Sequence, residues 1–276
     1  MLSSHRKSET KVMTFNNKTV WIIGASSGIG KALAFDFAKL NTKLVISSRQ
    51  VEELNKIQLE CLKHSPNCSV IPLDLEQNSN YEHKVKEVIQ KYKTIDYLII
   101  NGGISQRSFA AETPIEIDRK LMEVNYFGNI AITKAVLPQM IQQHSGHIVT
   151  VSSIVGKFGF PLRSAYSASK HALHGFYETL RLEHWNDNIN VTIVIPGRIK
   201  TNISINALTK NGEKHAEMDA GQNEGISAEA CSNQIIRAIQ KNKKEVLIGG
   251  KELIMVHLRK WFPFLFYKIA HNINTQ

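Results

Sequence analysis

A serine, a tyrosine and a lysine lie close together in residues 151–170, VSSIVGKFGFPLRSAYSASK, with spacing that suits acid–base chemistry. Tyr166 and Lys170 are four residues apart, so on a helix their side chains lie on one face, a single turn from each other. A free phenol titrates near about 10, and bringing its pKa close to neutrality requires roughly 4 kcal/mol. A unit charge about 4 Å away, at an effective dielectric of about 20, supplies roughly that amount. With Ser153 beside them, this pair predicts a tyrosine that exchanges a proton at neutral pH.

Spacing alone does not establish a catalytic site, because ordinary surface helices also carry tyrosine and lysine at positions i and i+4. The surrounding elements must therefore be able to bring a ligand to this stretch. Residues 19–23, TVWII, form an apolar β-branched run typical of a strand buried on both faces. The segment GASSGIG follows directly, and residues 31–40 then carry a helical apolar stripe.

Glycines between a strand and a helix let the backbone turn sharply and approach a ligand. The amino terminus of the following helix presents N–H groups that suit a phosphate. The segment that contains Gly24, Gly28 and Gly30 therefore predicts a dinucleotide cradle. A glycine-rich turn without a ligand is the alternative.

Strands and helices continue to alternate along the chain. Further strands are expected at residues 43–48, 69–73, 95–100, 147–151, 191–195 and 246–248. Helices are expected at residues 51–62, 81–92, 114–144 and 227–241, and a further helix holds Tyr166 and extends to about residue 184. This order predicts an α/β fold: a Rossmann-like, doubly wound parallel sheet of seven strands with helices on both faces. Ligands bind beyond the carboxyl ends of the strands in such sheets, and the candidate residues fall on that edge.

The totals allow one large core. The chain has 276 residues, and we expect one domain at residues 18–250, between a flexible arm at 1–17 and an apolar, basic tail at 251–276. The formal charge is +10, but from residue 241 onward seven basic side chains stand against two acidic ones, so half of the surplus belongs to the tail. Aromatic and basic residues do not interleave as in nucleic-acid-binding modules, so we expect no nucleic-acid partner.

The three cysteines bear on the compartment. Cys61, Cys68 and Cys231 are odd in number and lack metal-binding spacing, which argues against a disulfide framework or a zinc site. The first 15 residues contain no apolar stretch typical of a secretory signal. Both features favour a cytoplasmic protein.

With these motifs in order, the chain resembles the short-chain dehydrogenase/reductase family over about residues 18–247. GASSGIG is similar to the family's glycine motif, with Ile23 where a threonine is common. MEVNYFG places Asn125 at the family's helix asparagine, and VSS with YSASK places Ser153, Tyr166 and Lys170 at its serine, tyrosine and lysine. The resemblance implies a complete catalytic tetrad.

Three further motifs of the family are recognisable, one of them with departures. Residues 101–103 match the last three places of its Asn-Asn-Ala-Gly motif, with Ile100 in place of the first asparagine and Gly102 in place of alanine. Asp74, in PLDL, is at the position of the aspartate that contacts the adenine, and PGRIKT at 196–201 resembles the segment that packs on the nicotinamide. The expected cofactor contacts are Gly24, Ser26, Ser27, Gly28, Ile29, Gly30, Ser48, Arg49, Asp74, Leu75, Asn101, Gly102, Gly103, Tyr166, Lys170, Pro196, Gly197, Ile199 and Thr201.

The resemblance implies hydride transfer between a nicotinamide cofactor and a carbonyl or secondary alcohol. Tyr166 would exchange the proton with the substrate oxygen, and Lys170 would lower the tyrosine's pKa and hold the nicotinamide ribose. Ser153 would donate a hydrogen bond to the oxygen, and Asn125 would hold a water in the proton relay. No metal is required. A non-catalytic nucleotide-binding or regulatory protein on the same fold is the alternative.

The end of the second strand decides which dinucleotide is preferred. Sites for NAD place an acidic residue there, whereas an arginine accommodates the 2′-phosphate of NADP. The chain has Ser47, Ser48 and Arg49 and no acid, so we predict NADP(H) over NAD(H). A solvated arginine that opens the next helix is the alternative.

Residues 199–227 are polar with little apolar periodicity, and by resemblance we expect them to form a lid over the substrate. Phe158, Phe160, Pro161 and Leu162 are predicted to line the same pocket and favour a small-molecule substrate with an apolar body. Packing of these four against a neighbouring subunit is the alternative. The family often dimerises, so a homo-oligomer is expected by resemblance.

The last stretch, residues 252–272, concentrates apolar and aromatic side chains with Arg259, Lys260 and Lys268 among them. Its uncharged run at 261–267 is too short to span a membrane. An amphipathic anchor in the membrane interface is one interpretation, although Pro263 would interrupt a helix there. A tail that docks on the domain or on a second subunit is the other. Membrane association therefore stays open beside the cytoplasmic location.

Overall fold

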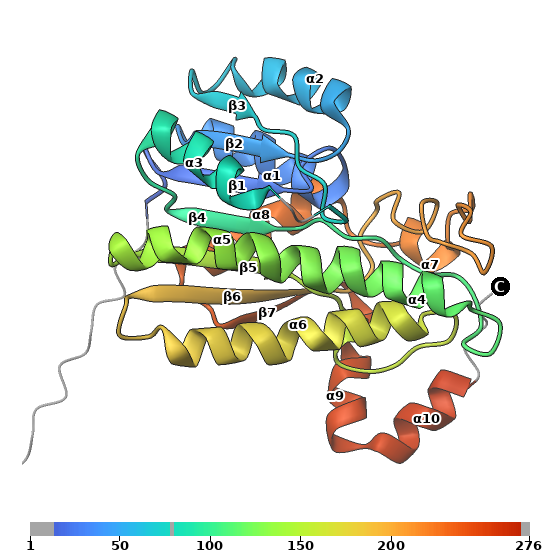
Figure 1. The fold of residues 1–276 in the computed structure, drawn as a ribbon. Coiled ribbons are helices and arrows are strands. Elements are labelled where there is room, and N and C mark those ends of the chain that lie inside the picture. Colours follow the sequence, from blue (N-terminus) through green and yellow to red (C-terminus); the bar gives the residue numbers. More distant parts are fainter. Residues whose placement is uncertain (1–13, 78–79, 272–276) are drawn as a thin grey trace, which may run out of the picture.

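The computed structural model describes residues 14–77 and 80–271 (Figure 1). Of the arm predicted at residues 1–17, residues 1–13 lie outside the described part. Phe15 is buried, and its ring packs 5.1 Å from the ring centroids of both Phe37 and Tyr97. The packed domain therefore reaches back to Phe15.

Seven parallel strands form one sheet in the order β3-β2-β1-β4-β5-β6-β7. This confirms the predicted doubly wound α/β fold. The strands are β1 Thr19–Ile23, β2 Lys43–Ser47, β3 Cys68–Val70, β4 Tyr97–Ile100, β5 Gly146–Val151, β6 Ile189–Pro196 and β7 Glu245–Ile248.

Helices cover both faces of the sheet. The helices are α1 Gly28–Lys39, α2 Val51–Cys61, α3 Tyr81–Tyr92, α4 Ile115–Met122, α5 Gly128–Gln142, α6 Ser164–Glu183, α7 Ala220–Asn223, α8 Ala228–Gln240, α9 Ile254–Trp261 and α10 Pro263–His271. Shorter turns are the π-helical η1 Glu123–Phe127 and the 3₁₀ turns η2 Ile154–Gly156 and η3 Lys251–Leu253. Figure 1 shows α5 and α6 running alongside each other over one face, with α1 and α8 behind the sheet.

Successive strand residues point to opposite faces, so each central strand serves two cores. In β1, Val20 and Ile22 pack with α1, α2 and α8, whereas Trp21 and Ile23 pack with α3, α5 and α6. All four side chains are almost completely buried. A strand buried on both faces must be apolar along its whole length, which is why TVWII could be recognised from the sequence.

Several predicted elements differ from the structure by one or two residues at an end, and two differ more. The third strand was expected at residues 69–73 but ends at Val70. Ile71 and Leu73 still donate backbone hydrogen bonds to Ile46 and Ser48. Pro72 between them faces away from β2, at the outer edge of the sheet, where its missing N–H breaks no ladder hydrogen bond. The single long helix expected at residues 114–144 is divided into α4, η1 and α5.

Candidate active site

The glycine loop between β1 and α1 is folded tightly against the end of β4. Gly24 and Gly28 have φ of +81° and +51°, in the left-handed region that side chains rarely adopt. A Cβ on Gly24 would lie 2.6 Å from the Cα of Gly102, and a Cβ on Gly30 would overlap the Gly24 carbonyl oxygen. These contacts show that the loop requires glycine because backbone packs on backbone.

Asn101 joins this loop to the sheet. Its Nδ2 donates to the Gly24 carbonyl at 3.0 Å, and its backbone N–H donates to the Ile23 carbonyl at 3.0 Å. The neighbouring Gly102 takes the place of the family's alanine, and a Cβ there would lie 2.5 Å from the Cδ1 of Leu75. Leu75 therefore fills the space that an alanine methyl would need.

A cavity of about 220 Å³ opens beside the loop. The predicted cofactor residues that line it are Gly24, Ser26, Ser27, Gly28, Ile29, Ser48, Arg49, Asp74, Leu75, Asn101, Gly102, Gly103 and Thr201. Ser27 begins α1 in an extended conformation, and its side chain makes no capping hydrogen bond to the described chain. The first turn of α1, with no acidic residue, therefore faces a hollow lined by backbone, which fits the phosphates of a dinucleotide.

Arg49 lies at the rim of this cavity. Its guanidinium is 3.9 Å from a carboxylate oxygen of Asp74 and 3.8 Å from one of Glu76, and more than half of the side chain is exposed. The Ser48 hydroxyl accepts a hydrogen bond from the backbone N–H of Gln50 at 3.0 Å. The two residues directly after β2 are thus a serine and an arginine whose ion pairs are long, and neither residue is acidic.

A second cavity, of about 480 Å³, continues from the first and shares five lining residues with it: Ile29, Asn101, Gly103, Thr201 and Ile203. Ser153, Tyr166 and Lys170 line it, together with Pro196, Gly197 and Ile199. Phe158 and Phe160 also line this cavity, as the sequence predicts, whereas Pro161 and Leu162 are absent from its described lining. Most of the predicted cofactor residues and three of the four predicted catalytic residues therefore line two adjoining cavities at the carboxyl edge of the sheet.

Tyr166 and Lys170 are one turn apart on α6, as their spacing predicts. Burial raises the pKa of Tyr166, and a hydrogen bond from Ser153 opposes that shift. The Lys170 Nζ lies 5.8 Å from the centre of the Tyr166 ring and donates to the Val151 carbonyl at 2.9 Å. Burial lowers the pKa of Lys170 to about 8.

Two arginines that the sequence analysis missed also act on Tyr166. The positive charges of Arg107 and Arg163 lower its pKa, and both line the larger cavity. Asp219 binds both: it accepts two hydrogen bonds from Arg107, one of them at 3.1 Å, and one from Arg163 at 2.9 Å. Burial acts to raise the pKa of Asp219, but the two guanidinium groups hold it below its usual range.

Gln106 is a second residue that the sequence does not reveal. Its side chain is fully buried, and its Oε1 accepts from the backbone N–H groups of Ala165 at 2.9 Å and Tyr166 at 3.3 Å. Arg163, at the capping position of α6, makes no such side-chain bond within the described structure. Gln106 therefore caps α6 from about 60 residues away.

Asn125 occupies the π-helical turn between α4 and α5. Its side chain is fully buried and pairs with the backbone of Ile104 in both directions, at 2.8 and 2.9 Å. Its Nδ2 also lies 3.1 Å from the hydroxyl of Ser169, and its carbonyl accepts from the side chain of Asn129. A Cβ on Gly103 would be 2.9 Å from the Asn125 Oδ1 and 3.5 Å from the Lys170 Nζ. Asn125 thus supports the loop next to Lys170, and it lines neither of the two cavities of the described chain.

The fold and the motifs define a Rossmann-type oxidoreductase. The chain matches the family described as short chain dehydrogenase over residues 18–212, which is most of its length, and it belongs to that family. The fold is one that binds NAD or NADP.

Two related proteins come from animals. The chain is 42% identical over 250 residues to dehydrogenase/reductase SDR family protein 7-like of Anopheles gambiae, which covers 88% of this chain and 78% of that protein. It is 40% identical over 258 residues to dehydrogenase/reductase SDR family member 7B of Mus musculus, covering 92% and 80%.

Solved structures share the fold. A short chain dehydrogenase/reductase from Burkholderia phymatum in complex with NAD superposes with a TM-score of 0.81 at 21% identity, covering 92% of this chain and 96% of that one. An alcohol dehydrogenase from Thermococcus sibiricus complexed with 5-hydroxy-NADP gives 0.73 at 21% identity, covering 86% and 97%.

Proposed function

We propose that this protein is an NADP(H)-dependent oxidoreductase that interconverts a carbonyl and a secondary alcohol. The observation that carries the proposal is the continuity of the two cavities: the glycine loop lines one, and Ser153, Tyr166 and Lys170 line the other. A dinucleotide held by its phosphates at the first cavity would have its other end free to reach the second cavity, which Tyr166 lines.

The nicotinamide cofactor, when bound, supplies or accepts the hydride. Tyr166 exchanges the proton with the substrate oxygen, and Ser153, which bonds to the same phenol, donates a hydrogen bond to that oxygen as charge develops. Lys170 adds positive charge below the ring and keeps its ammonium directed by the Val151 carbonyl. Asn125 holds the Ile104 backbone and with it the floor of the site.

Charge supports this assignment of the proton-transfer group. Tyr166 is buried, which by itself disfavours the phenolate, and several groups oppose that effect. Arg107 and Arg163 together carry two positive charges against the one negative charge of Asp219, so a net positive charge remains beside the phenol. The site therefore combines a water-poor surrounding with a field that favours loss of the phenol proton.

The preference for NADP(H) is supported by the end of β2. Ser48 and Arg49 stand there, and Arg49 is held by ion pairs at 3.8 and 3.9 Å. A 2′-phosphate offers a guanidinium a closer, charge-assisted partner than these carboxylates do. The apolar side chains of Phe158, Phe160 and Met255 in the larger cavity support a substrate with an apolar body.

The test is binding of NADPH and NADH to the purified protein, followed by NADPH oxidation across a panel of carbonyl compounds. We expect tighter binding of NADPH, turnover with apolar ketones or aldehydes, and a loss of about 10²- to 10⁴-fold in kcat for Tyr166→Phe. The variant should retain NADPH affinity, because the phenol is beyond the phosphate cradle. Equal turnover by Tyr166→Phe would refute the assigned role, and absence of dinucleotide binding would favour a non-catalytic protein on the same fold.

A further inference from the structure

The C-terminal helices α9 and α10 project from the body of the protein beside α6 (Figure 1). Large apolar side chains are unusually exposed on them. Among the described residues, seven of the seventeen exposed large apolar side chains lie between residues 254 and 269. We call six of them the tail patch: Trp261, Phe262, Phe264, Leu265, Tyr267 and Ile269, with exposed fractions from 38% to 84%.

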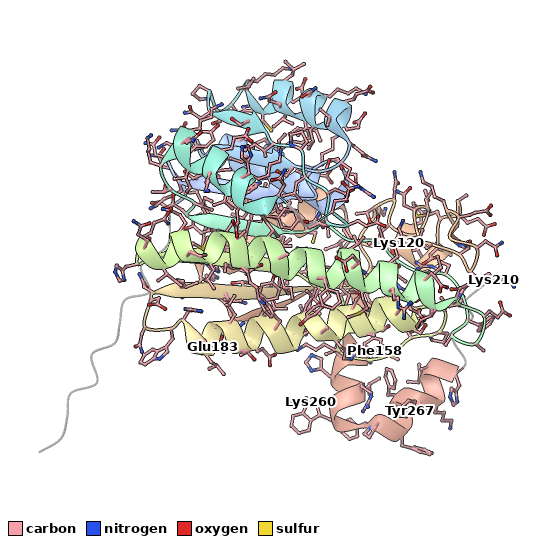
Figure 2. The ribbon with its side chains drawn as sticks, viewed as in Figure 1. Lys120, Phe158, Glu183, Lys210, Lys260 and Tyr267 are labelled. Atoms are coloured by element: carbon pink, nitrogen blue, oxygen red, sulfur yellow. The ribbon has the colours of Figure 1, made fainter. Side chains whose placement is uncertain are left out.

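The other side of α10 is already occupied. Phe266 is 2% exposed, and its ring centroid lies 5.2 Å from that of Phe158, while Ala270 is buried in the same small core. Figure 2 shows Phe158 on the side of the body toward the tail, with Lys260 and Tyr267 on the tail itself. The tail therefore docks on its own domain, as one of the two interpretations predicts, but this docking leaves the tail patch uncovered.

Pro263 separates the two helices without preventing either of them. It is the first residue of α10, where a missing N–H has no consequence for the helix. The break lets Phe262 and Phe264 stand on the outer corner, 63% and 84% exposed. Exposed apolar side chains gathered in this way are unfavourable in water and typically mark an interaction site.

Within the sequence of the tail, basic residues accompany the tail patch and acidic ones do not. From residue 253 to the end the sequence has Arg259, Lys260 and Lys268 and no aspartate or glutamate. The Arg259 guanidinium lies 5.5 Å from the centre of the Tyr267 ring, and the Lys260 ammonium lies 4.9 Å from the Trp261 ring. Basic residues combined with exposed Trp, Phe and Leu side chains are typical of helices that lie in the interface of a bilayer.

We propose that the tail patch docks this protein onto an anionic lipid surface. A second copy of the chain is the less suitable occupant, because in a two-fold interface the patch would meet itself and bring like charges together. An anionic bilayer complements the three basic residues and accepts the aromatic side chains. No helix in residues 14–77 and 80–271 is long and apolar enough to cross a membrane, so the proposed contact lies at the surface.

The location of the tail patch links docking to the active-site cavity. Met255, on α9, lines the larger cavity, and Phe158 lines it while packing on Phe266 of α10. Docking would therefore bring one wall of the cavity close to the bilayer. The proposal stands whether or not the proposed reaction is correct, since it depends only on the tail.

The test is co-sedimentation of the full-length protein with sucrose-loaded vesicles of phosphatidylcholine alone and with about one quarter phosphatidylserine. We expect at least tenfold stronger partitioning onto the anionic vesicles. The double variant Trp261→Asp, Phe264→Asp should lose at least tenfold of it. The matched control Leu182→Asp, Trp185→Asp alters side chains that are 74% and 72% exposed at the end of α6, and it should partition like the parent. Changing Lys260 to Gln should weaken partitioning about fivefold.

Fluorescence gives a second readout at the patch itself. Of the three tryptophans, Trp21 is fully buried, Trp185 is 72% exposed and Trp261 is 65% exposed. In a Trp185→Phe background, anionic vesicles should shift the emission to shorter wavelength through Trp261. Absence of partitioning, equal partitioning of the patch and control variants, or a concentration-dependent dimer that the patch variant abolishes would each overturn the proposal. The dimer would assign the surface to a second copy.

Discussion

The two halves of the candidate site are built by different means. Around the glycine loop, backbone packs on backbone: Gly24 lies against Gly102, and Gly30 lies under the Gly24 carbonyl. Around Tyr166, long side chains from distant segments meet, with Asp219 binding Arg107 across 112 residues of sequence and Arg163 across 56. The first half tolerates almost no change in residue type, whereas the second depends on partners that no local motif encodes.

We expect the largest effect from a substitution in the half of the site where backbone packs on backbone. Gly30→Ala places a methyl group on the Gly24 carbonyl oxygen and 2.7 Å from the Asn101 Nδ2, so the loop must shift away from β4. We expect NADPH affinity to fall by more than 10²-fold, measured by fluorescence titration. Gly159→Ala is the matched control, because its new Cβ meets nothing within 4 Å in the described structure. Equal affinity in the two variants would show that the loop is not held by this packing.

We expect the next largest effect from a substitution among the long side chains around Tyr166. Asp219→Asn leaves Arg107 and Arg163 facing each other with side chains only 5% and 15% exposed. We expect a loss of about 3 kcal/mol in the free energy of unfolding, measured in urea. Asp187→Asn, which removes a surface partner of His184, should cost less than about 1 kcal/mol.

The same variant also reports on Tyr166. Removing the negative charge strengthens the positive field on the phenol, so the ionisation that limits alcohol oxidation should move to lower pH. Arg107→Met should move it to higher pH, since the Arg107 charge lowers the pKa of Tyr166. A pH–rate profile unchanged in both variants would contradict any influence of the two arginines on the tyrosine.

A third prediction concerns the sheet that both halves share. Burial lowers the pKa of His147, in β5, to about 4, and the ring bonds to the Thr192 hydroxyl at 2.8 Å. Its pKa is lower in the folded than in the unfolded state, so the unfolded chain binds the extra proton first as pH falls below about 6.5. The contribution of neutral His147 to stability is therefore fully present above that pH. The free energy of unfolding should fall by about 2 kcal/mol by pH 5. His147→Gln should flatten this slope in urea denaturation, and an unchanged slope would assign it to other groups.

The smallest expected effect concerns the preference for NADPH over NADH. Ser48→Asp with Arg49→Gln removes the cation from the end of β2 and adds an acid there. The ratio of KM for NADPH to KM for NADH should rise by about ten- to hundredfold, because a charge-assisted hydrogen bond to phosphate is lost. Lys63→Gln, beyond the end of α2, is the control for general loss of positive charge. An unchanged ratio would remove Arg49 from the assignment.

The difference between the halves also explains what the sequence could predict. Strands buried on both faces and glycines at fixed offsets are local patterns, so the seven-stranded fold and much of the lining of the cavity beside the glycine loop were predictable. Gly102, which stands where the family motif has alanine, can also be explained: the Leu75 side chain occupies the space that an alanine methyl would need.

Other features have no local signal. Gln106 caps α6 from a separate loop, and Asp219 precedes the short helix α7 in a stretch whose composition indicated only a polar lid. Arg163 lies three residues before Tyr166, yet nothing in that spacing reveals its shared carboxylate. The lid at 199–227, the cytoplasmic location and the homo-oligomer stay predictions.

The division of the long helix also escaped prediction, since a π-helical turn differs from an α-helical one by a single residue. Only the folded chain shows why it is there: at η1 the freed Asn125 carbonyl is taken by the side chain of Asn129, while the Asn125 amide holds Ile104.

This turn makes the length of residues 121–128 as important as their identity. Deleting one residue there would restore an unbroken α-helix, which is locally favourable, and would leave α4 and α5 facing nearly as before, because a π-helical turn takes up one extra residue within about one turn. Leu121 could then keep its place in the small core that it shares with Phe158 and Phe266. The Asn125 side chain, however, would lose the position in η1 from which it bonds to Ile104. In a homologue, a one-residue gap in this segment would therefore indicate the loss of the hydrogen bonds between Asn125 and Ile104 more clearly than any substitution would.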